Sequence, residues 1–145
     1  MNILKELITA TLGSLGFALL FHVSKKHLPS AALGGLICWS AYLLSAKFIS
    51  GYFLAPLIAA AVSTLYAEIS ARIFKAPTTV FLIPSVIPLI PGSSLYYTMY
   101  YAVLGDYSQF KSFGEKTALI AFGMAVGISL VSGIFAVTFK TKRLK

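Results

Sequence analysis

The most informative stretch of this chain is Thr78–Leu104, TTVFLIPSVIPLIPGSSLYYTMYYAVL. It is apolar, and at about 1.5 Å per residue a helix of this length would cross a bilayer with some tilt. Pro84, Pro88 and Pro91 interrupt the stretch near its middle. Because proline has no N–H, each one leaves the carbonyl four residues earlier without its helical donor. The pattern therefore predicts a membrane-spanning helix that is broken into two halves.

The break leaves unpaired backbone groups on both of its sides. The freed carbonyls belong to Val80, Pro84 and Ile87. Gly92 permits a turn, and Ser93 or Ser94 can cap a second half-helix whose first N–H groups are also unpaired. In hydrocarbon such groups are tolerated only where they face protein or a wet cavity, and many transporters build substrate sites from broken helices. The positive end of the second half-helix favours a carboxylate or another anion.

The composition agrees with a membrane protein. The chain has 145 residues, of which 58% are hydrophobic and 11% charged, and we expect one transmembrane domain over 1–145. The net charge of +8 comes from basic residues placed between apolar runs, which is typical of topology signals rather than of nucleic-acid binding. Cys38 is the only cysteine, so a disulfide within the chain and a multi-cysteine metal site are excluded. No cofactor is expected.

Four more apolar runs predict membrane spans. They cover about Ile3–Val23, Ala31–Phe48, Tyr52–Phe74 and Thr117–Phe139, and with the broken segment they make five. The first run has no basic region before it and is interpreted as a retained span, not a signal peptide. Gly105–Lys116 is interpreted as a polar loop. The predicted fold class is all-α: a polytopic integral membrane protein with about five transmembrane helices, one of them broken at a Pro-Gly motif.

Small residues and charges predict how these spans are arranged. Gly123 and Gly127 form a GxxxG pair that is expected to suit another subunit. With the N-terminus outside and five crossings, eight Lys and Arg residues lie inside and four outside, in agreement with the positive-inside rule. A re-entrant broken segment would give six against six, so the crossing arrangement is preferred. The expected location is a prokaryotic cell membrane, with the C-terminus in the cytoplasm.

Four tyrosines follow the break. Tyr100 and Tyr101 suit an interfacial aromatic belt. Tyr96 and Tyr97 lie within about one helical turn of the break, and for these two both a belt and the lining of a polar path stay open. The candidate substrate-binding residues are Pro88, Pro91, Gly92, Ser93, Ser94, Tyr96 and Tyr97. The alternative for the prolines is a kink that only shapes packing.

Glu68 lies inside a predicted span and is the candidate for proton coupling. A carboxylate within a membrane is expensive and is typical of a proton carrier or a substrate gate. Arg72 follows four residues later, so a local ion pair is the alternative. No Ser/His/Asp set, paired carboxylates or His-rich metal spacing appears, and the sequence does not indicate an enzyme or a metal site.

The run from Ala67 to Met99 resembles the threonine/serine exporter family of prokaryotes. The resemblance rests on Glu68 and Arg72 in AExxAR, on Lys75 and Pro77 in KxP, on IPLIPG at 87–92, on LYYTM at 95–99 and on GDY at 105–107. It is closest to the small subunits similar to the C-terminal half of the full-length exporters. Ser85 stands where the motif often has glycine after the first proline, which stiffens the first half-helix.

The resemblance implies secondary export of small amino acids such as threonine and serine, linked to the proton-motive force. It also implies a larger membrane subunit as partner, and for some relatives the export of dicarboxylates such as succinate. Besides the bilayer and that subunit, a homo-oligomer is an alternative assembly. The rival hypothesis is a membrane assembly partner that transports nothing and whose prolines only kink a docking helix.

Overall fold

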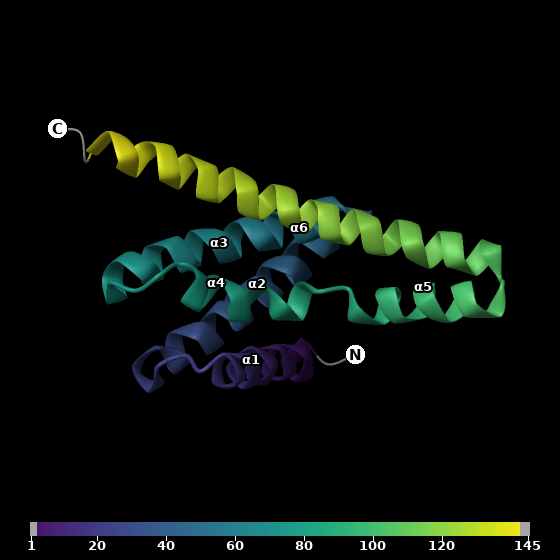
Figure 1. Ribbon diagram of the computed structural model, residues 1–145, viewed down its shortest axis with the longest axis horizontal. Helices are drawn as coiled ribbons and strands as arrows, with labels where there is room; N and C mark the ends of the chain where they lie inside the picture. Colours follow the sequence, from purple (N-terminus) through teal and green to yellow (C-terminus); the bar gives the residue numbers. More distant parts are fainter. Residues whose placement is uncertain (1–2, 143–145) are drawn as a thin grey trace.

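The computed structural model describes the backbone of residues 3–142 and the side chains of 3–138. The described part consists of helices joined by short turns and contains no strand (Figure 1). Its elements are α1 (Ile3–Leu20), η1 (Lys25–His27), α2 (Leu28–Phe48), α3 (Leu54–Phe74), α4 (Thr79–Val86), η2 (Ile87–Leu89), α5 (Gly92–Leu104) and α6 (Tyr107–Lys142). Four helices are long and apolar enough to cross a membrane, and the bent pair α4–η2 and α5 adds a fifth. The predicted fold class is confirmed.

The interior consists mainly of small side chains, and the large apolar ones face outward. Ala18, Ala59 and Ser63 are fully buried, whereas Phe48 and Val103 are 85% and 87% exposed. This distribution is expected where lipid is the solvent, because lipid does not drive large apolar side chains inward and small residues let helices approach closely. The core is therefore held by close backbone contact between helices, with α2 and α3 at its centre.

The GxxxG pair of α6 packs inside the chain, which corrects the expectation that it faces another subunit. A Cβ added at Gly123 would overlap the carbonyl oxygen of Phe53, and one at Gly127 would overlap that of Leu57. Both glycines thus lie directly on the backbone of α3 or of the residue before it. No partner surface is left on this face of α6, because α3 already occupies it.

The expected polar loop at 105–116 is wrong, because α6 already begins at Tyr107. Gly105 adopts a left-handed φ of 73° and ends α5, and the Asp106 carboxylate accepts the N–H of Gln109 at 3.1 Å as an N-cap. One glycine and one cap therefore suffice to turn the chain. The polar residues that follow, among them Gln109 and Lys111, are compatible with an exposed helix.

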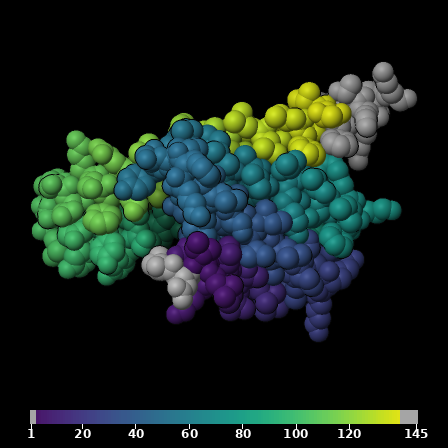
Figure 2. All heavy atoms as spheres, turned by 180° about the vertical axis from the view of Figure 1, so that it is seen from behind, coloured from purple at the N-terminus to yellow at the C-terminus, as the bar shows by residue number. Residues whose placement is uncertain are grey.

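With 36 residues, α6 is about 54 Å long, which exceeds the roughly 30 Å of a hydrocarbon core. Figure 1 shows α5 beside the first half of α6, and Figure 2 shows these segments as a lobe at one end of the molecule. Thr98 and Thr117 contact each other across this pair, with their hydroxyl oxygens 3.5 Å apart. We call α5 with residues 107–116 the α5–α6 hairpin.

The broken segment bends by 57° between Thr79–Leu89 and α5. Two details differ from the expected geometry. Gly92 has no positive φ and is itself the first residue of α5, so neither serine caps the helix through its side chain. The Ile87 carbonyl is not free either, because it accepts the N–H of Ile90 at 3.1 Å in a tightened turn. The bend comes from the prolines and this turn, and no glycine-specific conformation is needed at Gly92.

Candidate functional site

The break leaves two backbone donors at the start of α5. Within the bend, Gly92 donates its N–H to the Ile90 carbonyl at 2.8 Å, and Leu95 donates to that of Pro91 at 2.9 Å. The N–H groups of Ser93 and Ser94 lie between these two and have no acceptor within residues 3–142. Since the first N–H groups of a helix carry its positive end, this position attracts an anion.

A cavity of about 370 Å³ lies against these donors. Five elements, α2, α3, η2, α5 and α6, and the turn before α5 contribute its lining, which comprises Trp39, Tyr42, Pro56, Pro88, Leu89, Ile90, Pro91, Gly92, Ser93, Ser94, Lys116 and Ile120. We call it the break cavity. Its volume lies within the range of about 300–1,000 Å³ that small-molecule pockets occupy.

Lys116 is the one charged residue among those that line the break cavity. Its side chain comes from the hairpin portion of α6, and its ammonium lies 4.8 Å from the centroid of the Tyr52 ring. Among the described side chains no carboxylate lies within 4.0 Å of this ammonium. A cation on one wall and the N-terminus of α5 on another together favour a carboxylate.

Five of the seven predicted substrate-binding residues line the break cavity, namely Pro88, Pro91, Gly92, Ser93 and Ser94. Ser94 is buried, whereas Ser93 is exposed. Tyr96 and Tyr97 do not line it. Tyr96 is 63% exposed and stacks on Tyr100, and Tyr97 packs against Phe113 of α6 at 5.2 Å between ring centroids. The tyrosines thus belong to the hairpin and not to the cavity wall.

Glu68 and Arg72 lie apart from the break cavity, since neither lines it. The Glu68 carboxylate accepts a hydrogen bond from the Arg72 guanidinium at 2.7 Å, and the two side chains are 12% and 36% exposed. The Arg72 guanidinium also lies 4.6 Å from the centroid of the Phe135 ring on α6. The pair therefore links the C-terminal end of α3 to α6. Within residues 3–138, no three His, Cys, Asp or Glu side chains are grouped to hold a metal ion.

Sequence reasoning missed seven of the twelve residues that line the break cavity, among them Lys116, Trp39 and Tyr42. Lys116 belonged to a presumed loop, and Trp39 and Tyr42 gave no signal beyond their place in an apolar span. A spacing of three or four residues in the sequence predicts that two side chains share one face of a helix. It does not predict which helices pack against each other. The one sequence feature that pointed to Lys116 is its place directly before the apolar run that begins at Thr117, which puts it near the end of a span.

Two comparisons with known proteins bear on this site. The family described as "Threonine/Serine exporter, ThrE" matches residues 6–134 of the chain. That range includes every residue that lines the break cavity, as well as Glu68 and Arg72. No solved structure matches the chain.

Proposed function

Because the chain belongs to the threonine/serine exporter family, we propose that it is a membrane subunit of a secondary exporter of small carboxylate-bearing metabolites, such as threonine and serine. Membership of an exporter family and four to five apolar helices make it a multi-pass membrane protein. The family is one of transporters and not of enzymes. The substrate, the driving force, the partner and the orientation in the cell membrane are parts of the proposal.

The break cavity carries this proposal. A substrate carboxylate would accept hydrogen bonds from the backbone N–H groups of Ser93 and Ser94, and it would face the Lys116 ammonium. A charge-assisted hydrogen bond is worth about 1.5–3 kcal/mol, so the contacts suffice to select an anionic group. Pro88 and Pro91 hold the bend open, since neither can donate to the preceding turn and straighten the helix.

Proton coupling is assigned to Glu68 with Arg72. Protonation of Glu68 would neutralise its carboxylate, which lies 2.7 Å from the Arg72 guanidinium, and would weaken this ion pair. Because Arg72 also contacts Phe135 of α6, such a step would link a proton to the packing of α3 on α6. Export driven by the proton-motive force needs a link of this kind between proton binding and helix movement.

The proposed partner is a larger membrane subunit of the same family. In α1, added Cβ atoms at Gly13 and Gly16 would meet nothing within 4 Å, so this small-residue face is open to another helix. The hairpin exposes Leu95, Met99 and Val103 as well. A homo-oligomer would use the same faces, and co-purification with and without the partner gene separates the two assemblies.

The test is efflux of radiolabelled serine from cells of the source organism that lack their own copy of the gene and carry a plasmid copy. We expect Lys116→Gln to weaken apparent affinity for the carboxylate substrate about tenfold or more. Lys111→Gln is the matched control, because Lys111 lies on the same hairpin, pairs with Glu115 at 3.8 Å and does not line the cavity.

Membrane levels and partner pull-down are measured beside efflux. If Lys116→Gln assembles normally and exports at wild-type rates over a full concentration range, the break cavity is not the substrate site. The chain would then be an assembly partner whose prolines only shape packing. Succinate efflux in the same cells shows whether the carboxylate-bearing substrate is instead a dicarboxylate.

A further inference from the structure

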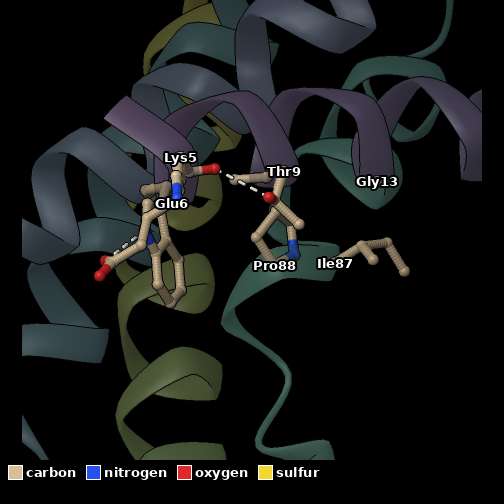
Figure 3. Close-up of a pocket in the computed structure, with 8 residues that line it drawn as sticks. Lys5, Glu6, Thr9, Gly13, Ile87 and Pro88 are labelled. Atoms are coloured by element: carbon tan, nitrogen blue, oxygen red, sulfur yellow. Dashed lines mark hydrogen bonds between the residues drawn. The ribbon is translucent and has the colours of Figure 1, made fainter. Parts of the chain in front are cut away.

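An apolar groove of about 320 Å³ lies between α3 and α6, two helices that Figure 1 shows side by side. Its lining comprises Ala61, Val62, Leu65, Val131, Ile134 and Phe135, and we call it the α3–α6 groove. The break cavity contains Lys116 in its lining, and the cavity of about 400 Å³ between α1, α2 and η2 contains Lys5 and Glu6 (Figure 3). The α3–α6 groove is lined by apolar residues alone, so it does not suit a polar substrate.

The α3–α6 groove opens on the surface of the helix bundle. Leu65 is 43% exposed and Ile134 is 64% exposed, although both are large apolar residues. Both helices are long and apolar enough to cross a membrane. The acyl chains of the bilayer are therefore the apolar groups that surround this surface.

The length of the groove matches one leaflet of the bilayer. Between Ala61 and Arg72, α3 rises by about 16 Å, because each helical residue adds about 1.5 Å. The hydrocarbon core of a bilayer is about 30 Å thick, so one leaflet contributes roughly half of this. A single acyl chain can thus extend along the groove with its headgroup at the C-terminal end of α3.

Basic side chains lie at that end of α3. The Arg72 guanidinium lies 4.6 Å from the centroid of the Phe135 ring, which is a wall of the groove, and the exposed Lys75 is the C-cap of α3. Arg72 also pairs with Glu68 at 2.7 Å. Because a guanidinium has five N–H donors, it can serve a carboxylate and a phosphate together. The end of the groove therefore suits a negatively charged headgroup.

We propose that the α3–α6 groove binds one acyl chain of an anionic phospholipid, with the headgroup phosphate at Arg72 and Lys75. Basic pockets between transmembrane helices hold lipid headgroups in this manner. The phosphate then shares Arg72 with Glu68, so the strength of that ion pair depends on the lipid. The effect on proton coupling rests on the proposed function, whereas the binding of the lipid does not.

Native mass spectrometry of the purified protein tests this site, after incubation in detergent with equal amounts of phosphatidylglycerol and phosphatidylcholine. Both lipids carry one palmitoyl and one oleoyl chain, so a preference reports the headgroup. We expect phosphatidylglycerol to be retained about fivefold over phosphatidylcholine, which is the effect of one basic residue near a headgroup. Arg72→Gln should abolish this preference. An excess of inorganic phosphate should not displace the lipid, because phosphate has no chain to fill the groove.

A second variant tests the groove with its charges intact. Leu65→Trp fills the groove and should lose most of the bound lipid, whichever headgroup it carries. Leu130→Trp is the matched control and should bind as wild type does, because Leu130 is also an exposed leucine but does not line the groove. Leu65→Trp keeps the proposal testable if Arg72→Gln fails to fold.

Equal retention of both lipids by wild type would overturn the proposal, and so would wild-type binding by Leu65→Trp or displacement of the lipid by phosphate. Protein that co-purifies with a larger subunit and retains no lipid would assign the groove to a helix of that subunit, which also contradicts the proposal. None of these results depends on efflux of serine. Failure of the lipid site and failure of the proposed function are therefore distinguishable.

Discussion

At the scale of the residue, Trp39 has two sets of contacts at once. Its indole N–H reaches Glu6 on α1, and its ring packs on Tyr42 with centroids 5.0 Å apart on the side of the break cavity. Trp39 therefore lines both the break cavity and a second cavity beside Glu6 and Thr9.

Glu68 carries a prediction of its own. We expect Glu68→Gln to lower serine efflux driven by a pH gradient at unchanged membrane levels, because glutamine cannot carry a proton. Glu115→Gln, which removes an exposed carboxylate paired with Lys111, should have no effect. Efflux by Glu68→Gln that follows the gradient as wild type does would reduce Glu68 to the partner of Arg72 in a local ion pair.

At the scale of the element, the hairpin turn depends on a single backbone conformation. Gly105 has a φ of 73°, and the Asp106 N–H donates to the Tyr101 carbonyl at 3.1 Å to close the end of α5. Gly92 begins the same helix without a positive φ and with open space where a Cβ would be. These two glycines bracket α5 but differ in what they require.

We therefore expect Gly105→Ala to destabilise the protein by about 1–2 kcal/mol, since a left-handed alanine is strained. Gly92→Ala should fold as stably as wild type, because alanine fits a helix start without strain. Thermal unfolding of the two purified variants in detergent measures the difference. A Gly92→Ala variant that is the less stable of the two would show that the turn at the break does need glycine.

The contact between α3 and α6 predicts a second pair of variants. We expect Gly127→Ala to destabilise the fold by about 1–3 kcal/mol, because the added methyl would overlap the Leu57 carbonyl oxygen on α3. At Gly133 on the same helix an added Cβ would meet no atom within 4 Å, so Gly133→Ala measures the gain in helix propensity without a steric overlap. Equal stabilities of these variants would mean that α3 and α6 separate easily, and that Gly127 is available to a partner.

At the scale of the whole molecule, the charge distribution predicts its orientation. Lys25 and Lys26 lie at the end opposite to the hairpin, and the hairpin carries Lys111 and Lys116. Part of the inward charge count rests on Lys140, Lys142, Arg143 and Lys145, whose side chains lie outside the described residues. The orientation with the N-terminus outside remains a prediction and places the hairpin on the outer face.

Cysteine labelling tests this orientation, because the native Cys38 is buried and does not compete for reagent. Intact cells treated with a membrane-impermeant maleimide should label Ser108→Cys on the hairpin and not Lys25→Cys on η1. Both positions are exposed, so accessibility depends on the side of the membrane alone. Labelling of Lys25→Cys together with protection of Ser108→Cys would show the opposite orientation and contradict the prediction.

The sequence by itself determined the all-α membrane class, the existence of the break and five of the residues that line its cavity. These features are local: apolar runs of spanning length, and prolines that remove specific donors, act the same way whatever packs around them. Only the tertiary structure decided that Gly127 lies on α3, that Lys116 faces the break and that Glu6 meets Trp39. Each of these contacts depends on which helices pack together and on how far they are shifted along each other. The small residues that allow helices to approach closely in a membrane do not identify the helix they pack against.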